Sequence, residues 1–365
     1  IISRYNYRNQ RLRCLSNCMI SQITLKNVRR FDNLSLNINS NKVILQGKNA
    51  SGKTTVLESI FLVSITKSHR TNNLKEIIKE NEMYADIKTV YEKKNYRIVL
   101  SNQGKMVSIN NVEKTKISDY IGEFPTIFFS PSDLEIITSS PTLRRGFLNQ
   151  EISQISQTYL KNLNLYNKLL QERNSLLKEL EVTSDTKLLD IITTQLIEVG
   201  KKIIVDRMKF VNELNQVINN VHSKISSDEK IEIVYQPSVS LEKIEEVFES
   251  KKMSDILSHQ TNYGIQRDEL IFLINDKNAS KFASQGQIRN VILSTKLSLC
   301  KIIYKYKKKY PILLLDDVLS ELDITRQNSL LNLLDNFTNV QTFISTVDTS
   351  SLNKEILKKY QIINL

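Results

Sequence analysis

The sequence predicts an α/β fold with an inserted helical arm that forms a second lobe, and three observations support this prediction. Residues 42–46 are a strand-like run, and residues 311–315 are a continuous apolar run typical of a parallel strand covered on both faces. Residues 56–61 follow the first run with apolar side chains at helical spacing. Residues 159–221 carry apolar side chains three, four and seven positions apart, which indicates long helices.

The 365 residues are enough for two or three domains at about 150 residues each. A regular apolar pattern begins only after Met19, so we expect residues 1–18 to be a disordered or non-native extension. Residues 19–150 are predicted to form a strand-rich first lobe. Residues 151–260 are predicted to form the helical arm, and residues 261–365 to continue the first lobe.

The chain carries 51 Lys and Arg against 39 Asp and Glu, a net charge of +12. This surplus favours a polyanionic partner, nucleic acid before membrane, although lysine-rich surfaces also serve solubility alone. No apolar run approaches the roughly 18 residues of a membrane span, so we expect no integral membrane protein. Three cysteines without a CxxC pair and three scattered histidines argue against a disulfide framework or a structural zinc site. We therefore expect a reducing, cytoplasmic location.

A glycine-rich loop lies between the predicted strand 42–46 and the predicted helix that follows it. Its pattern, G-x-x-x-x-G-K-T, in a strand–loop–helix context is that of a P-loop. Its backbone N–H groups and the helix N-terminus would hold phosphates, Lys53 would reach the β- and γ-phosphates, and Thr54 would bind Mg²⁺. A chance match is the alternative, and the flanking elements disfavour it. The predicted ATP-binding residues are Gly47, Lys48, Asn49, Ala50, Ser51, Gly52, Lys53, Thr54 and Thr55.

Two acids follow the second predicted strand, at the edge where ligands bind in open α/β sheets. Asp316 is predicted to bind Mg²⁺, and Asp317 to polarise the attacking water, so Asp317 and Lys53 are the predicted catalytic residues. Paired acids could instead cap the next helix. The independent P-loop signal favours the functional interpretation.

A second anion-binding helix start is predicted at a small-residue turn before a long apolar helix. The turn consists of Ser284, Gln285, Gly286 and Gln287. Free N–H groups at a helix start form a phosphate site. A single chain does not need two such sites to bind one nucleotide. Two sites per chain are useful when two chains associate and each completes the nucleotide pocket of the other.

Together these motifs resemble the RecF family of ABC/SMC-type ATPases, the bacterial DNA replication and gap-repair proteins. The resemblance rests on the P-loop, the SQGQ turn, LLLDDVLSELD at 313–323 and FISTVD at 343–348. Supporting stretches are ITLKNVRRF at 23–31, KSHRT at 67–71, FSPSDL at 129–134 and SPTLRRGFL at 140–148. The match extends from about Met19 to the end.

The resemblance implies an ABC-type P-loop ATPase head with an inserted arm, and ATP and Mg²⁺ as cofactors. It also implies an ATP-dependent homodimer in which the SQGQ turn acts in trans and Ser320, Glu321 and Asp323 line the shared interface. Binding to DNA at gaps or junctions, RecO and RecR as partners, and RecA loading are implied likewise. Slow, DNA-stimulated ATP hydrolysis would then reset the protein.

The chain departs from the family pattern at two places. The segment that usually reads GPHRDDL has Ile265 and Gln266 in place of Pro and His. Asp317 stands where most ABC ATPases have Glu, as in the RecF family, and a shorter carboxylate suits slow hydrolysis. Ser345 and Thr346 occupy the position of the transporter switch histidine, where their hydroxyls could orient the γ-phosphate.

Basic groups are candidate DNA contacts because arginine pairs well with phosphate. The candidates are Lys67, Arg70, Arg144 and Arg145. His69 lies beside the expected nucleotide site, where a lone histidine is more often structural, so we assign it only a minor role near phosphate or DNA. The arm could be a docking site or a bundle without partners.

Other functions remain as alternatives, the nearest being an ABC-type ATPase of another DNA-maintenance process. A transporter ATPase would need a different helical insertion and a different signature than SQGQ. An ATP-gated nuclease of the overcoming-lysogenisation type would need an acidic metal-binding domain beyond the roughly 40 residues that follow Asp323. A nucleotide-sensing scaffold without hydrolysis is the last alternative.

Overall fold

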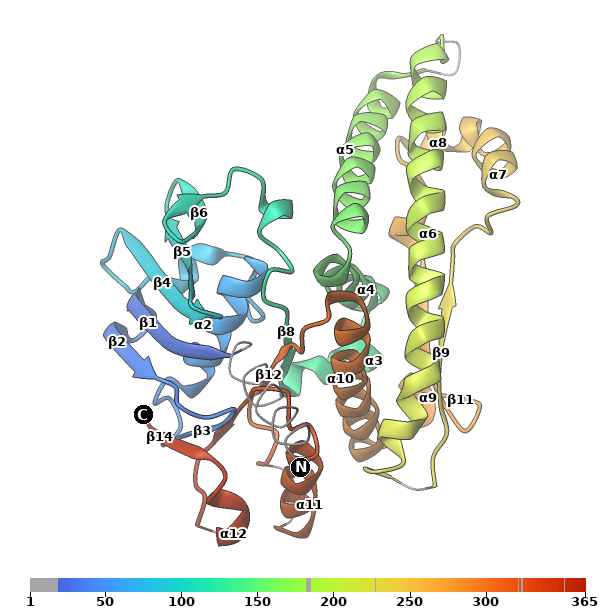
Figure 1. The fold of residues 1–365 in the computed structure, drawn as a ribbon. Coiled ribbons are helices and arrows are strands. Elements are labelled where there is room, and N and C mark those ends of the chain that lie inside the picture. The colour runs from blue at the N-terminus through green and yellow to red at the C-terminus, as the bar shows by residue number, and fades with distance from the viewer. Residues whose placement is uncertain (1–18, 182–184, 227, 321, 323, 351) are drawn as a thin grey trace, which may run out of the picture. The chain divides into compact units, whose positions relative to one another are not determined.

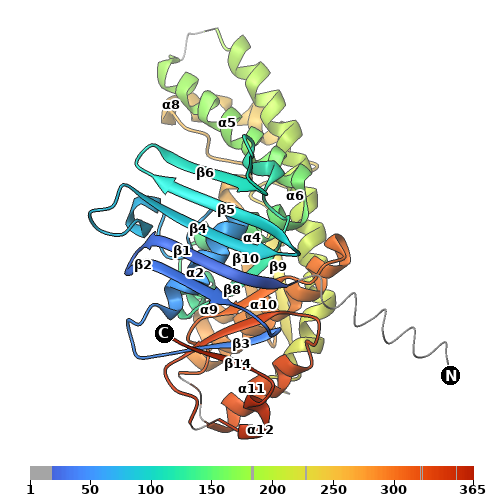
Figure 2. The same ribbon diagram turned by 60° about the vertical axis from the view of Figure 1, so that its left-hand side comes forward.

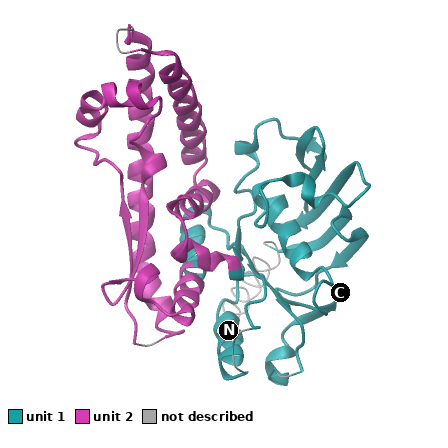
Figure 3. Cartoon of the chain, turned by 180° about the vertical axis from the view of Figure 1, so that it is seen from behind, with its two compact units in different colours: residues 1–131, 296–365 teal, residues 132–295 magenta. Residues whose placement is uncertain are grey.

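The computed structural model describes residues 19–365 except 182–184, 227, 321, 323 and 351. The predicted extension, residues 1–18, therefore lies outside the described residues. The chain forms two compact units, residues 1–131 with 296–365 and residues 132–295 (Figure 3). Among the described helices, none combines the length and apolar character that a membrane crossing requires.

The first unit contains an antiparallel sheet built largely from residues near the start of the chain (Figure 2). Alternating burial along its strands is typical of a sheet with one covered face. In spatial order its strands are β2 (Phe31–Asn37), β1 (Ile20–Val28), β4 (Tyr84–Tyr91), β5 (Lys94–Ser101), β6 (Gly104–Ile109) and β7 (Val112–Glu113).

The second sheet of this unit is parallel and brings together strands from distant parts of the sequence. In spatial order its strands are β14 (Gln361–Asn364), β3 (Lys42–Gln46), β13 (Thr342–Thr346), β12 (Ile312–Leu315) and β8 (Thr126–Phe129). Strand β12 and the middle of β3 are apolar runs, and β13 between them is buried along its whole length, as expected for a sheet covered on both faces. All five strands point the same way, so the loops after β3, β13, β12 and β8 meet at one edge.

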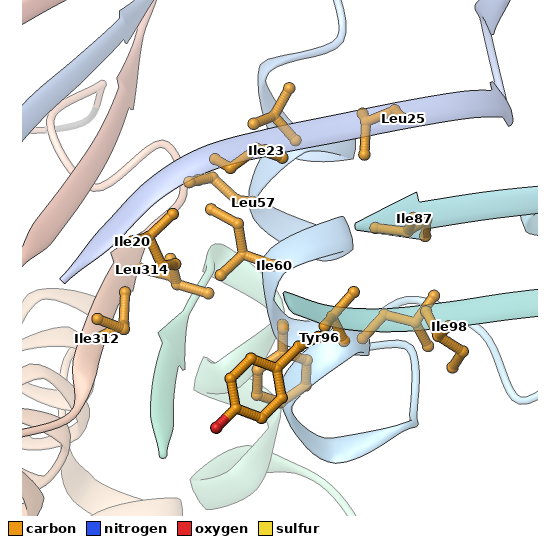
Figure 4. Close-up of a cluster of buried hydrophobic side chains, with 14 of the residues drawn as sticks. Ile20, Ile23, Leu25, Leu57, Ile60, Ile87, Tyr96, Ile98, Ile312 and Leu314 are labelled. Atoms are coloured by element: carbon orange, nitrogen blue, oxygen red, sulfur yellow. The ribbon is translucent and has the colours of Figure 1, made fainter. Parts of the chain in front are cut away.

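Helix α2 (Lys53–Ile65) lies between the two sheets and contacts strands of both. Every residue from Thr55 to Ile65 is buried, so the helix is enclosed on all sides rather than amphipathic. Leu57 and Ile60 of α2 join a cluster with Ile23 of β1 and Leu314 of β12 (Figure 4). This enclosure holds the first turn of α2 in place at the edge of the parallel sheet.

The remaining elements of the first unit surround these sheets. The buried side chain of Lys42 bonds to the end of one of these elements, α11 (Ile324–Asp335). Lys42 Nζ donates to the carbonyls of Leu334 at 2.7 Å, Phe337 at 3.2 Å and Val340 at 3.3 Å. These carbonyls belong to the end of α11 and the turn after it, so Lys42 caps that helix. The elements are η1 (Leu74–Ile77), η2 (Ile117–Asp119), α11 (Ile324–Asp335) and α12 (Lys354–Leu357).

The second unit is mainly helical, with a small antiparallel sheet of β9, β10 and β11 (Figure 1). The helix α10 (Gln285–Lys307) begins in this unit and continues into the first. The other elements are η3 (Pro131–Leu134), α3 (Glu135–Thr138), α4 (Pro141–Ile155), α5 (Gln157–Glu179), α6 (Lys187–His222), β9 (Ile231–Gln236), α7 (Ile244–Ser250), α8 (Lys252–Ser258), η4 (Ile265–Arg267), β10 (Glu269–Ile274), β11 (Lys277–Asn278) and α9 (Ala279–Phe282).

The predicted fold class, α/β with an inserted helical arm, is confirmed. The limits of the second unit, residues 132 and 295, differ from the predicted limits of the arm, 151 and 260. The difference has a physical cause. Strand β9, inside the predicted arm, pairs with β10, which the sequence analysis assigned to the continuing lobe.

We predict that Lys42→Met lowers the free energy of unfolding by roughly 2–4 kcal/mol at pH 7, because three carbonyls, two of them buried, lose their donor. Burial lowers the pKa of Lys42 from 10.5 to about 8. Between these values the unfolded chain binds a proton that the folded chain has released, so the stability of the parent rises with pH. The variant lacks this contribution, and its deficit should widen from pH 8 to 10.5 in denaturant titrations. A deficit independent of pH would contradict the assignment.

Candidate nucleotide-binding site

The P-loop connects β3 to α2, and two glycines make its path possible. Gly52 has a φ of +104°, and a Cβ there would lie 2.3 Å from the ring of Phe31. At Gly47 a Cβ would lie 2.5 Å from the carbonyl oxygen of Leu365 and 2.6 Å from Ser51 Oγ. The loop therefore passes closer to its neighbours than any side chain would permit.

The side chain of Lys53 folds back over the loop. Its Nζ donates to the carbonyl oxygens of Gly47 at 2.6 Å and Lys48 at 2.9 Å. An ammonium has three hydrogens, so one remains for a phosphate oxygen. Ser51 Oγ is buried and has no hydrogen-bond partner within the described structure, which fits a loop built for an external acceptor.

Asp316 follows β12 and forms the centre of the polar edge. Its Oδ1 accepts hydrogen bonds from Thr54 Oγ1 at 3.0 Å and from Ser345 Oγ at 2.7 Å. Burial raises the pKa of Asp316, and neighbouring Asp317 raises it further, whereas the two hydroxyls and His69 oppose this shift. The structure thus brings together the P-loop threonine and the predicted metal-binding acid.

Asp317 adopts a left-handed backbone conformation with a φ of +52°. Its N–H donates to Ser345 Oγ at 2.8 Å, and its carbonyl accepts from Ser320 Oγ at 3.0 Å. Ser345, which the sequence analysis assigned to the γ-phosphate, holds both acids here. Thr346 Oγ1 instead donates to the carbonyl of Asp348 at 3.0 Å.

His69 lies at the same edge of the first unit. Its ring stacks on Phe128 of β8 with centroids 4.4 Å apart, and its Nε2 lies 2.6 Å from Ser130 Oγ. Ser130 follows β8, and the N–H of Asp316 donates to the carbonyl of Phe129 at 2.8 Å. Ser130 and Asp316 are therefore adjacent on neighbouring strands. The sequence analysis quoted the stretch that contains Ser130 without assigning it a role.

Residues near the turn between β1 and β2 support the P-loop, and the sequence analysis missed this role. Arg30 donates to the carbonyl of Ala50. Arg29 forms two hydrogen bonds of 3.0 Å with Glu58, a buried carboxylate of α2 that also accepts from Ser68. The paired arginines in the quoted stretch 23–31 were the available signal.

The predicted signature turn begins α10 in the second unit. Ser284 and Gln287 hydrogen-bond reciprocally: Ser284 N–H donates to Gln287 Oε1 at 2.9 Å, and Gln287 N–H donates to Ser284 Oγ at 3.3 Å. This is a capping box, which confirms the helix start expected there. Ser284, Gln285 and Gly286 are exposed.

The other predicted positions differ in their surroundings. Ser320 is exposed, whereas Glu321 and Asp323 lie outside the described residues. Lys67 and Arg70 are exposed. Arg144 is bound to Glu269 at 2.6 and 2.9 Å.

Arg145 also has its acceptors within the second unit. It donates to the carbonyl of Asp268 at 3.0 Å and to Thr142 Oγ1 at 3.1 Å. Whether Arg144 and Arg145 contact DNA stays a prediction. Their guanidinium groups already have protein acceptors.

The first departure from the family pattern, Ile265 and Gln266, lies inside the second unit. Ile265 is buried, and Gln266 accepts from the Tyr166 hydroxyl at 2.6 Å and donates to the carbonyl of Tyr263 at 2.7 Å. The adjacent Asp268 forms a buried ion pair of 2.6 Å with Arg207. In this structure, residues 265–268 therefore stabilise the second unit.

The site suits Mg²⁺ held together with a nucleotide rather than by protein alone. Among the described residues there is no cluster of three or more His, Cys, Asp and Glu side chains. The Thr54 hydroxyl and the Asp316 carboxylate, 3.0 Å apart, are the kind of oxygen ligands that Mg²⁺ prefers, and phosphate oxygens and waters would have to supply the rest.

Comparison with known proteins gives a consistent result. Residues 19–363 match the family model described as the RecF/RecN/SMC N terminal domain. A DNA replication and repair protein RecF from Bacillus cytotoxicus is 42% identical over 361 residues, covering 95% of this chain and 96% of the relative. The RecF protein of Bacillus mycoides is 41% identical with the same coverage.

Solved structures agree with the sequence relatives. A structure of the recombination mediator protein RecF-ATP in the RecFOR pathway has a TM-score of 0.86 and 30% identity, covering 92% of this chain and 94% of that one. An Smc head bound to the C-winged helix domain of ScpA has a TM-score of 0.53 at 14% identity, covering 94% of this chain and 93% of that one, which supports the fold alone.

We predict that Lys53→Ala lowers ATP affinity roughly 10- to 100-fold without unfolding the chain, because a charged hydrogen bond is lost and no core is disturbed. The matched control is Lys48→Ala, which removes an exposed side chain but keeps the backbone N–H through which this loop residue would bind phosphate, so ATP affinity should stay near that of the parent. Titration with a fluorescent ATP analogue measures affinity, and circular dichroism checks folding. Undiminished affinity in folded Lys53→Ala would refute the P-loop assignment.

Proposed function

The chain belongs to the RecF/RecN/SMC N-terminal domain family, and on this premise we propose that it is an ATP-dependent DNA-binding protein of replication and recombinational repair. The observation that carries the proposal is the convergence of Lys53, Thr54 and Asp316 at one edge of the parallel sheet. Nucleotide binding, dimerisation and slow hydrolysis would then form a cycle that controls DNA binding.

In the first step, the P-loop binds the ATP phosphates. The loop N–H groups and the N-terminus of α2 attract negative charge, and Lys53 Nζ donates to a phosphate oxygen the hydrogen that its bonds to Gly47 and Lys48 leave over. Thr54 and Asp316 would hold Mg²⁺, which would neutralise phosphate charge. The enclosure of α2 makes this binding site rigid before the nucleotide arrives.

In the hydrolysis step, Asp317 orients the attacking water and accepts its proton. Ser345 bonds both Asp316 and the N–H of Asp317, so it holds the two acids in one arrangement. Asp317 directly follows Asp316, the proposed metal ligand, in the sequence. We assign hydrolysis the role of reopening the protein, with DNA as a stimulant.

ATP also drives association of two chains, with Ser284 and Gly286 of one chain facing the γ-phosphate bound by the other. Gly286 supports this arrangement. A Cβ at this position would meet only Ser284 Oγ, at 4.0 Å, and the residue has no positive φ, so the fold of the chain itself does not require glycine. The close approach of another molecule at this position would require glycine.

DNA binding follows from charge and is gated by closure. Two chains of net charge +12 repel each other when free, and both ATP and DNA offset this repulsion. Lys67 and Arg70 are exposed and suited to phosphate contact. RecO and RecR are the proposed partners, and RecA loading at gaps the proposed outcome, by similarity to the RecF proteins of the RecFOR pathway.

We predict separable roles for the two acids. Asp317→Asn should retain ATP and Mg²⁺ while slowing hydrolysis roughly 100-fold or more, because the water loses its base. Asp316→Asn should raise the Mg²⁺ concentration needed for half-maximal turnover roughly 10-fold, because a charged ligand is lost. Steady-state ATPase assays over a Mg²⁺ series measure both. Parent rates in both variants would make the acids structural.

A second prediction concerns Gly286→Ala. The substitution should stabilise the monomer by up to about 1 kcal/mol, because alanine favours helix. It should weaken ATP-driven association roughly 10-fold or more, because the added methyl group blocks a close approach. Sedimentation velocity with ATP and Mg²⁺, in an Asp317→Asn background that prevents turnover, measures association. The exposed Gly146→Ala is the control, since a Cβ there also meets nothing within 4 Å. Equal association in both variants would contradict the assignment in trans.

A further inference from the structure

A chain of four hydrogen bonds connects the signature turn to a buried histidine of the second unit. Gln287 Nε2 donates to Glu229 Oε1 at 2.8 Å, and Glu229 Oε2 lies 3.1 Å from His222 Nε2. His222 Nδ1 lies 2.8 Å from Ser294 Oγ. With the bond from Ser284 N–H to Gln287 Oε1, the chain runs from the turn to the end of α6 and back to α10. Figure 1 shows the end of α6 beside the start of α10.

This chain of bonds fixes the orientation of the Gln287 amide. An amide has an acceptor end and a donor end, and here the oxygen faces Ser284 N–H while the nitrogen faces Glu229. A rotated amide would place its NH₂ against the Ser284 N–H, so Glu229 selects the orientation that caps the helix.

The capped turn keeps its remaining donors available. Ser284 Oγ accepts from Gln287 N–H, so its own hydroxyl hydrogen is not used in that bond. Ser284, Gln285 and Gly286 are exposed. The arrangement holds a hydroxyl and helix-start N–H groups ready for an anion.

Glu229 and His222 are held in place from several sides. His222 is fully buried on α6, between Ser294 of α10 and Glu229. Partial burial would raise the pKa of Glu229, but hydrogen bonds from Gln287, His222 and Ser226 outweigh it and lower the pKa. The carboxylate is therefore ionised and accepts bonds on both oxygens.

We propose that Glu229 and His222 are positioning residues that hold the Gln287 amide, and through it the Ser284–Gln287 turn, in the form that receives the γ-phosphate of a second chain. Neither residue touches the nucleotide. The consequence for dimerisation rests on the proposed function, whereas the effect on the turn itself does not. The inference gives the helical arm a part in the ATP cycle through α6.

The test compares Glu229→Ala with two controls. Glu229→Gln keeps an oxygen for Gln287, and Glu232→Ala removes an exposed acid from β9 nearby. Hydrogen exchange of the Ser284 and Gln287 amides, measured by mass spectrometry without nucleotide, reports on the turn. Sedimentation velocity with ATP and Mg²⁺ in the Asp317→Asn background reports on association, and a fluorescent ATP analogue reports on the P-loop.

Glu229→Ala should accelerate amide exchange in the turn roughly 3- to 10-fold, because a capping bond is lost. It should weaken ATP-driven association roughly 10-fold, since each dimer contains two such turns. The ATP affinity of the monomer should stay unchanged, because Glu229 does not touch the nucleotide. Glu232→Ala should match the parent, and Glu229→Gln should fall between the parent and Glu229→Ala, because its one oxygen can accept from Gln287 while none is left for His222. His222→Ala should reproduce the effect of Glu229→Ala.

Unchanged exchange in folded Glu229→Ala, or an equal effect of Glu232→Ala, would overturn the inference. If the parent fails to associate with ATP, the proposed function fails, and the exchange measurement still decides the role of Glu229. A general loss of structure would appear as faster exchange throughout the second unit, including α5, and would also refute a specific role.

Discussion

The enclosure of α2 between two sheets is the constraint on which the site depends. A helix buried from Thr55 to Ile65 cannot rotate or slide without exposing apolar surface, at about 25 cal/mol per Å². Its first turn carries Lys53 and Thr54, so their positions are set by packing against strands of both sheets rather than by the loop alone. Phosphate binding thus begins from a geometry that the apolar core has already fixed.

Polar contacts then connect the strands of the parallel sheet at its functional edge. Ser345 of β13 holds the two acids after β12, and Thr54 bonds to the same carboxylate. Strand β13 lies between β3 and β12, so Ser345 is the side chain best placed to reach both acids. The Ser345 hydroxyl donates to the Asp316 carboxylate and accepts from the N–H of Asp317, so in this structure it orients the two acids.

Local patterns predicted where the candidate site residues lie in the fold, whereas long-range pairing limited the prediction of domain boundaries. The P-loop, Asp316 and the Ser284 helix start are local motifs, and each was found where the spacing placed it. The helical spacing over residues 159–221 is also a local signal, and the structure forms the long helices α5 and α6 there. The register between β9 and β10 has no local signal, so the limits of the second unit were missed. The bonds among Gln287, Glu229 and His222 depend on that same tertiary arrangement.

The order of strands in the parallel sheet has a consequence for synthesis on the ribosome. Strand β3 emerges early, yet both of its neighbours, β13 and β14, are translated about 300 residues later. At about 5–20 residues per second, β3 has neither neighbour for roughly 15–60 s. During that interval Val43, Ile44 and Leu45 lack the strands that later cover their backbone, and such an unpaired apolar edge is prone to aggregation. The nucleotide site is thus completed only after β13 has been translated, and until then β3 depends on other means to avoid association.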